Sequence, residues 1–269
     1  MAPTSPPWLR REEPVLLGVV HLLPLPGSPG YGGEGMGPIL EAARRDARRL
    51  LEAGFDGYVI ENFGDAPFFK DGVPSHTVSA MTRVAMELAR PDKILGANVL
   101  RNDAASALAV ALAAELDFIR VNVHVGAALT DQGIVEGRAA ETLRLRSSLR
   151  SNVAIVADVD VKHARPLATG YDRREAAKET YGRGGADALI VSGAATGAPV
   201  RLSDLEEIVS AVPDAPVWIG SGATPETARE LLSLAAGIIV GTSVKEGANV
   251  HAPVDPSRAR AFIDAARGA

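Results

Sequence analysis

The sequence predicts an α/β protein, a closed (β/α)8 TIM barrel, and three features of its pattern support this. Eight short apolar segments typical of strands alternate with helical patterns along the 269 residues. Four of these segments are preceded by similar residues. The last two segments each end in a glycine-containing loop, where TIM barrels commonly bind phosphate. Right-handed crossovers between the strands close such a parallel sheet into a barrel.

The strands are identified first by the residues that precede them. The four related segments are AGFDGYVIEN from Ala53, AELDFIRVNV from Ala114, GGADALIVSG from Gly184 and LAAGIIVGTS from Leu234. In each, small residues end a helix and an apolar strand follows, and in three of them an Asp separates the two. Strands preceded by different residues lie between them. Together they give predicted strands at 15–21, 57–62, 94–99, 117–124, 153–160, 187–192, 216–220 and 237–241.

Helical patterns fill the intervals between the strands. ILEAARRDARRLLEA from Ile39, DAASALAVALAA from Asp103 and PSRARAFIDAAR from Pro256 are three of them, with apolar residues at roughly three- and four-residue spacing. The alternative fold is an open doubly wound sheet, which favours a glycine fingerprint directly after the first strand. The first strand here continues instead into HLLPLPGSPGYGGEGMGP from His21, so the closed barrel is favoured.

Composition narrows the class of protein. Apolar residues make up 46% and aromatic residues only 4%, which predicts a core of Val, Ile, Leu and Ala. The net charge of −5 argues against a nucleic-acid partner. The absence of cysteine excludes disulfides and thiolate sites and is typical of a cytoplasmic enzyme. No apolar run approaches the ~20 residues of a membrane span. We expect residues 1–14 to form a flexible arm and 15–269 a single barrel domain.

The two glycine-containing loops predict a phosphate site. One strand ends in Gly220-Ser221-Gly222 and the last in Gly241-Thr242-Ser243, while Thr224 and Pro225 are suited to begin the intervening helix. Glycine allows close approach of a ligand, and exposed backbone N–H groups attract phosphate. The alternative is that these glycines only form tight turns. We expect additional phosphate contacts from the sixth strand exit, at Ser192, Gly193 and Thr196. A phosphorylated small molecule is therefore the predicted ligand.

Catalytic groups in this fold lie at the carboxyl ends of the strands. The candidates there for catalysis are Asp158, His21, Lys162 and Glu61, and those for substrate binding are Asn62, Asn98, Asn122, His124, Asp160 and His163. Two-residue alternation places Asp158, Asp160 and Lys162 on one face of the fifth strand. Asp158 is the first choice as general acid and base, because desolvation and nearby Lys162 can tune its pKa.

Several of these residues have structural alternatives. Asp158 could be paired with Lys162 or His163, and His21 could be a hydrogen-bonded structural group. Lys162 could hold a substrate carboxylate or phosphate, or form a Schiff base. Arg120 either points into the barrel and pairs with a carboxylate or lies in the outer layer.

The sequence predicts no cofactor. Glu61, His124, Asp158 and His163 offer oxygen and nitrogen ligands, which leaves a divalent metal as an open alternative. A compact two-histidine motif such as H-x-x-x-H is absent from the sequence.

Two long loops follow the first two strands. In Leu22–Pro38, Tyr31 and Met36 either cover a bound ligand or belong to a rigid surface loop. The loop ENFGDAPFFKDGVPSHT from Glu61 carries Phe63, Phe68 and Phe69, which predicts a lid or a subunit interface and hence a homo-oligomer.

Five motifs together resemble the BtpA/SgcQ family. They are GVVHLLPLPGSPGY from Gly18, IEN from Ile60, ADVDVKHARPLA from Ala157, WIGSGATPE from Trp218 and GTSVKEG from Gly241. The resemblance runs from Leu17 to about Asp264. It implies a phosphate-binding TIM barrel, like the ribulose-phosphate-binding barrels. For function it implies either a photosystem I biogenesis factor or a protein of sugar-utilisation operons with a nucleosidase label.

An enzyme fits the polar strand ends better than an assembly factor does. The expected activity is on a phosphorylated sugar or nucleotide-like substrate, with nucleosidase-like C–N cleavage favoured. Isomerase or aldolase chemistry is the alternative, because it needs the same acid and base beside a phosphate anchor. A non-catalytic assembly or regulatory factor is the alternative from another class.

Overall fold

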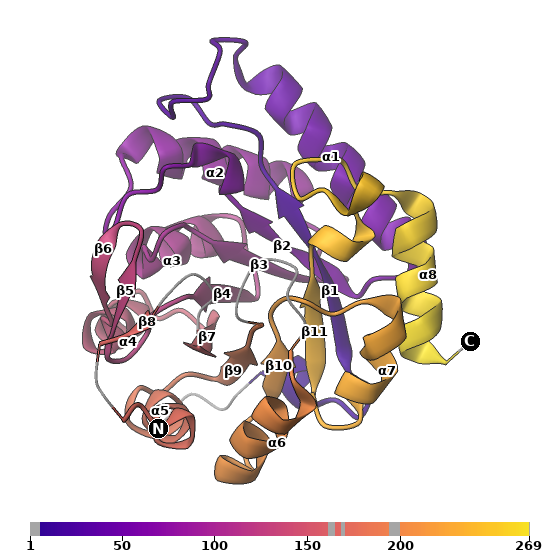
Figure 1. Cartoon of the computed structure of the whole chain (residues 1–269). Helices are drawn as coiled ribbons and strands as arrows, with labels where there is room; N and C mark the ends of the chain where they lie inside the picture. The colour runs from indigo at the N-terminus through magenta and orange to yellow at the C-terminus, as the bar shows by residue number, and fades with distance from the viewer. Residues whose placement is uncertain (1–5, 161–164, 168–169, 194–199, 269) are drawn as a thin grey trace.

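The chain forms a closed barrel of eight parallel strands in a computed structural model, which describes residues 6–160, 165–167, 170–193 and 200–268 (Figure 1). The barrel strands are β1 (Val15–His21), β2 (Gly57–Glu61), β3 (Ile94–Asn98), β4 (Phe118–Val121), β7 (Ala154–Asp160), β9 (Ala188–Val191), β10 (Val217–Ile219) and β11 (Gly237–Val240). They are joined in this order, and β11 pairs with β1 to close the barrel. The predicted TIM-barrel fold is therefore confirmed.

Helices surround the barrel and connect its strands (Figure 1). They are α1 (Met36–Ala53), α2 (Ser75–Leu88), α3 (Ala104–Ala113), α4 (Ala139–Ser148), α5 (Arg173–Lys178), α6 (Leu202–Ala211), α7 (Pro225–Leu232) and α8 (Pro256–Arg267). In α1, Ile39, Ala43, Ala47 and Leu50 are buried at three- and four-residue spacing, so one face packs on the sheet. The helix ends at Gly54, whose φ of 103° favours glycine.

The core has two parts. One cluster lies between the sheet and its helices, and the other fills the barrel interior. The interior cluster includes Val15, Leu17, Val19, Val59, Phe118, Val156, Ile190, Trp218 and Ile239. Because this apolar filling occupies the earlier positions of the strands, the inward positions nearer their carboxyl ends are free for polar side chains.

The N-terminal segment closes the opposite end of the barrel. The turn η1 (Pro7–Arg10) places the Trp8 ring centre 5.7 Å from that of Phe118 and 5.9 Å from that of Trp218. Leu9 is buried in the interior cluster. We expected a flexible arm over residues 1–14, and within it the side chains of Trp8 and Leu9 pack on the barrel interior. Residues 1–5 lie outside the described residues.

A small antiparallel sheet was not predicted from the sequence. It consists of β5 (Ala127–Thr130), β6 (Gly133–Glu136) and β8 (Arg165–Pro166), with β5 in the centre. The β5–β6 hairpin turns at Asp131 and Gln132, and Gly133 adopts a φ of 95°. This sheet lies beside α4 at the edge of the molecule (Figure 1).

Shorter turns complete the chain at η2 (Phe63–Asp65), η3 (Glu179–Arg183), η4 (Thr242–Val244) and η5 (Glu246–Ala248). In the described part of the chain, no helix has the length and apolar character needed to cross a membrane.

Candidate functional site

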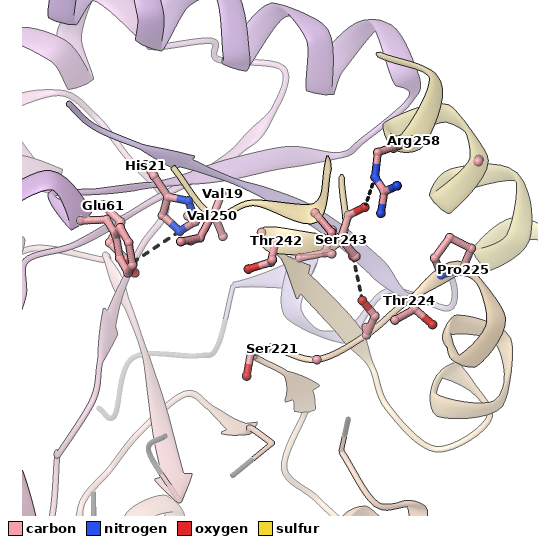
Figure 2. A pocket seen from close by; sticks show the side chains of 18 of the residues that line it. Val19, His21, Glu61, Ser221, Thr224, Pro225, Thr242, Ser243, Val250 and Arg258 are labelled. Atoms are coloured by element: carbon pink, nitrogen blue, oxygen red, sulfur yellow. Dashed lines mark hydrogen bonds and ion pairs between the residues drawn. The ribbon is translucent and has the colours of Figure 1, made fainter. Parts of the chain in front are cut away.

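A cavity of about 350 Å³ lies at the carboxyl ends of β1, β2, β10 and β11 (Figure 2). Its lining includes His21, Glu61, Phe63, Arg120, Val250, Arg258 and the segments 220–226 and 240–243. His21 and Glu61 lie on one side, Arg258 and Pro225 on the other, and Thr242 between them (Figure 2). The two glycine-containing loops therefore meet at one cavity that also receives ionisable side chains from earlier strands.

The two loops present unused donors to this cavity. No hydrogen bond between described residues uses the backbone N–H of Ser221, Gly222, Thr242 or Ser243 as donor. The hydroxyl oxygen of Ser221 is buried and also lacks a partner among the described residues. Gly222 has a φ of 79°, a conformation that favours glycine. Such a set of N–H groups beside a hydroxyl is suited to bind an anion.

Side-chain contacts fix the two loops relative to each other. The Ser243 hydroxyl donates to the Ala223 carbonyl oxygen at 2.8 Å, which joins the β11 loop to the β10 loop. Arg258, in the first turn of α8, donates from Nε to the Ser243 carbonyl oxygen at 2.9 Å and lines the cavity. As predicted, Thr224 is the N-cap of α7 and Pro225 its first residue. Arg258 thus adds positive charge beside the donors.

Glu226 is the acidic residue at this rim. It is fully exposed, and a hydrogen bond from the Thr224 side chain lowers the pKa of its carboxyl. Its exposure lets solvent screen its repulsion of a bound anion.

Glu61 and His21 form the ionisable pair of the cavity. His21 Nε2 lies 3.7 Å from Glu61 Oε1, and each side chain is only 10% exposed. Asn98 donates from Nδ2 to Glu61 Oε2 at 2.7 Å, so it orients the carboxylate. The His21 ring packs on Phe63 with 4.8 Å between ring centres. A side chain at Gly241 would bring its Cβ to 3.0 Å from His21 Cε1, so glycine leaves room for the imidazole.

Asp158 occupies a position different from the one we predicted for an acid–base catalyst. Its carboxylate is fully buried and accepts two hydrogen bonds from Arg120, at 2.9 and 2.8 Å. Asn122 Nδ2 donates to it at 2.9 Å and Ser192 Oγ at 3.2 Å. Asp158 is absent from the cavity lining. Its oxygens are committed to these partners, so its role is to hold Arg120 in place.

Arg120 therefore points into the barrel, which resolves the two alternatives that the sequence left. Its side chain is 4% exposed and lines the cavity. Burial lowers the pKa of Arg120, but the Asp158 carboxylate outweighs burial and raises this pKa above its usual value.

The end of β7 departs from regular alternation. A bulge between Asp158 and Asp160 shifts the register against β9, and a bulge reverses the alternation of faces. Predicted site residues Lys162, His163 and Thr196 lie outside the described residues, as does the side chain of Asp160.

Three predicted substrate-binding residues have roles inside the protein. Asn62 donates from Nδ2 to Asp65 Oδ2 at 3.1 Å and accepts from Leu100 N–H at 2.8 Å. Asn98 and Asn122 orient Glu61 and Asp158, as described above. None of the three is in the cavity lining, so the structure does not support direct substrate contact by these amides.

His124 lies away from the cavity. Its Nε2 is 2.8 Å from the Gly184 carbonyl oxygen, and burial lowers the pKa of the imidazole. Since β4 ends at Val121, strand alternation does not extend to His124, which is the reason for the wrong orientation in our prediction. Ser192 supports Asp158, and neither it nor Gly193 lines the cavity.

The described residues contain no group of three His, Asp or Glu side chains that could hold a metal. Of the ligands considered from the sequence, His124 faces Gly184 and Asp158 is enclosed by its donors.

The first long loop is packed and does not cover the cavity. Leu25 is fully buried, and its N–H donates to Asp65 Oδ1 at 2.8 Å. Tyr31 and Met36 pack against the outer core and are absent from the cavity lining. Of the second loop, Phe63 reaches the cavity, Phe68 packs on Phe63, and Phe69 is 58% exposed.

Sequence reasoning missed Arg258, which lines the cavity, and the buried Arg101, which does not line it. Arg258 lies at a helix start, whereas the strand-end rule points only to residues that follow strands. Arg101 follows β3 and is buried, which lowers its pKa, while the charges of Asp131, Asp158 and Glu61 act in the opposite direction. A basic residue directly after Asn98-Val99-Leu100 was the available signal.

Comparisons with known proteins agree on fold and ancestry. The sequence model of the BtpA family matches residues 11–268. "Photosystem I biogenesis protein BtpA" of Synechocystis sp. is 48% identical over 251 residues, covering 93% of this chain and 87% of that protein.

Two solved structures are similar in fold. Phosphoribosyl anthranilate isomerase from Thermus thermophilus has a TM-score of 0.55 and 13% identity, over 94% of this chain and 98% of that one. Thiamine phosphate pyrophosphorylase from Pyrococcus furiosus has a TM-score of 0.57 and 18% identity, over 94% of this chain and 96% of that one.

Proposed function

The chain belongs to the BtpA family, and from this premise and the geometry of its cavity we propose an enzyme that acts on a phosphorylated sugar or nucleotide-like substrate. The observation that carries the proposal is the meeting of two loops with unused N–H donors at a cavity that also contains Glu61 and His21. The phosphate lies on the N–H groups of 221–222 and 242–243, with Arg258 beside it.

The likeness to phosphate-handling barrels supports this proposal at the level of fold. The isomerase from Thermus thermophilus and the pyrophosphorylase from Pyrococcus furiosus are both named for phosphorylated compounds. A phosphate anchored at the last two strand exits leaves the rest of such a substrate free to extend toward β1 and β2.

Glu61 and His21 replace Asp158 as the proposed acid–base groups. They face the cavity, whereas the oxygens of Asp158 are committed to Arg120, Asn122 and Ser192. Asn98 holds one Glu61 oxygen, which leaves Oε1 for a proton shared with substrate or His21. Nucleosidase-like C–N cleavage and isomerase or aldolase chemistry both use such a pair.

The experiment compares ribose 5-phosphate with unphosphorylated ribose as ligands of the purified protein. We expect ribose 5-phosphate and inorganic phosphate to raise the melting temperature, and ribose to have no effect at the same concentration. Equal effects of ribose and ribose 5-phosphate, or none from either, would contradict a phosphate-anchored substrate.

A second candidate is a non-catalytic assembly or regulatory factor, favoured by the name of the Synechocystis relative. Glu61→Gln distinguishes the two, because it removes the proton-accepting charge and keeps the hydrogen bond to Asn98. An assembly factor retains its biological effect in this variant, whereas an enzyme loses turnover and retains ligand binding.

Two further proposals concern the protein as a whole. We propose that it acts in the cytoplasm and that exposed Phe69 contributes to a homo-oligomer. Light scattering of the wild type and Phe69→Ser tests the second of these: equal masses at the monomer value would contradict it.

A further inference from the structure

The guanidinium of Arg120 lines the cavity, and its Nη1 edge makes no short hydrogen bond to a described residue. Arg120 donates from Nε and Nη2 to the carboxylate of Asp158. Among the described residues, its Nη1 has only a long contact of 3.5 Å to the Gly220 carbonyl oxygen. Only 4% of this side chain is exposed, yet it lines the cavity. A buried guanidinium normally satisfies its N–H groups, so the Nη1 edge is available to a ligand.

The orientation of this guanidinium is fixed before any ligand binds. Asn122 and Ser192 hold the Asp158 carboxylate, which in turn holds Arg120 by two hydrogen bonds. A Cβ at position 220 would lie 2.9 Å from Arg120 Nη2 and 2.7 Å from Ser192 Oγ, so glycine leaves the space that Arg120 occupies. Donors held rigidly in this way stabilise charge that develops on a reacting atom, without a cost of reorganisation.

The acid–base pair faces the same cavity. Glu61 and His21 line it together with Arg120, and the charge of Glu61 is close enough to contribute to the raised pKa of Arg120. A substrate anchored by its phosphate would therefore meet a carboxylate base and a fixed cationic donor at its other end. This combination is suited to a transition state with negative charge on oxygen.

We propose that Arg120 binds the oxygen of an enediolate, so that the substrate is a phosphorylated sugar with a carbonyl beside a hydroxyl-bearing carbon. This inference rests on the phosphosugar function proposed above. It selects isomerisation over C–N cleavage, because cleavage of a glycosidic bond develops positive charge at the sugar carbon. The Nη1 edge offers N–H donors, which stabilise negative charge on oxygen and not a cationic carbon.

The reaction balances without a co-reactant. Glu61 accepts the proton from the hydroxyl-bearing carbon, and the C–H electron pair forms a C=C bond to the carbonyl carbon. The carbonyl π electrons move to oxygen, which becomes the oxyanion held by Arg120. The hydroxyl proton then moves to this oxyanion with His21 as relay, and Glu61 returns its proton to the former carbonyl carbon. The product is the isomeric sugar phosphate.

The first test compares two phosphorylated mimics of opposite charge. A pentonohydroxamate 5-phosphate resembles the enediolate, and an iminoribitol 5-phosphate resembles the cationic centre of C–N cleavage. Titration calorimetry should show at least about 100-fold tighter binding of the hydroxamate by the wild type. Arg120→Lys retains a cation beside Asp158 but loses the planar fork, and it should reduce this preference at least about 10-fold.

Arg146→Lys is the matched control for Arg120→Lys. Arg146 is also a buried arginine paired with a carboxylate, that of Asp187, but it lies outside the cavity lining. It should retain the wild-type preference for the hydroxamate. Tighter binding of the iminoribitol, or the same preference in Arg120→Lys as in the wild type, overturns the inference. If neither mimic binds, the proposed phosphosugar function fails with it.

The second test detects enolisation directly and needs no knowledge of the product. The protein is incubated in D2O with ribose 5-phosphate, ribulose 5-phosphate, glucose 6-phosphate and fructose 6-phosphate. Proton NMR should show loss of the signal from hydrogen next to the carbonyl for at least one of them. The exchange should be lost in Glu61→Gln and fall at least about 100-fold in Arg120→Lys. Binding of these sugars without exchange, or release of free base from nucleoside 5′-monophosphates, overturns enolisation and leaves the phosphate site intact.

Discussion

Arg120 and Asp158 form a two-pronged ion pair between the neighbouring strands β4 and β7, with Nε and Nη2 of the guanidinium at 2.9 and 2.8 Å from the two carboxylate oxygens. Because both residues are almost fully buried, the pair directs the free edge of Arg120 toward the cavity and shields the carboxylate from it. Asp158 is thus a positioning residue for Arg120.

Asp158→Asn should destabilise the protein strongly. Removing one partner of a buried ion pair leaves an uncompensated charge, which typically costs about 3–5 kcal/mol. Urea unfolding measures this free energy. Asp187→Asn, which breaks the other buried arginine pair, is the control for the general cost of such a change. A loss below about 1 kcal/mol for Asp158→Asn would show that Arg120 is satisfied without its partner.

Gly222→Asp should abolish stabilisation by phosphate. The new carboxylate would lie beside the unused N–H groups of the β10 loop and compete with the anion or repel it. Thermal unfolding with and without phosphate measures the effect. We expect phosphate to leave the melting temperature of this variant unchanged.

Gly126→Asp is the matched control for Gly222→Asp. Gly126 also has a positive φ, of 73° against 79° for Gly222, so both variants carry similar backbone strain. Gly126 is exposed and outside the cavity lining, so its variant should retain the phosphate shift of the wild type. Loss of the shift in both variants would point to destabilisation and not to an anion site.

The sequence was informative about the barrel because strands and their polar carboxyl ends follow from periodicity. That rule located His21 and Glu61 correctly in the cavity, and it placed the two glycine loops on one side. It failed where the backbone leaves regular strand geometry. The end of β4 before His124 changes the direction of side chains without changing the apolar pattern.

Side-chain partners on different elements were also beyond sequence reasoning. Arg120 and Asp158 are 38 positions apart, and alternation alone left the direction of Arg120 undecided. The contribution of Arg258 depends on where α8 begins relative to the β11 loop, which the path of the intervening segment 244–255 determines. The packing of Trp8 on Phe118 and Trp218 likewise joins three distant segments.

Trp8→Ala should lower stability even though Trp8 precedes the barrel. Its ring packs on Phe118 and Trp218, and it remains half-buried. We expect a loss of about 2–3 kcal/mol, somewhat below the ~3–5 kcal/mol of a fully buried tryptophan. Urea unfolding followed by circular dichroism measures the difference. Glu12→Ala, an exposed change in the same segment, is the control, and equal stabilities of the two variants would contradict the packing role.

His124 should make the protein less stable in mild acid. Burial lowers the pKa of His124 below 6.5, so the folded protein takes up this proton at a lower pH than the unfolded chain. Between the two pKa values the unfolded state binds more protons, and stability therefore falls as pH decreases below about 6.5. This fall ends once the pH is below the pKa of the folded state. One proton contributes at most about 1.4 kcal/mol per pH unit.

Urea unfolding at pH 7.5 and 5.5 isolates this contribution when His124→Gln is compared with the wild type. Glutamine keeps a donor for the Gly184 carbonyl oxygen but does not titrate, so the variant should lose less stability on acidification than the wild type. His76→Gln, a change at an exposed histidine, should lose as much unfolding free energy between pH 7.5 and 5.5 as the wild type does. An identical acid loss in His124→Gln would mean that His124 is charged in the folded state.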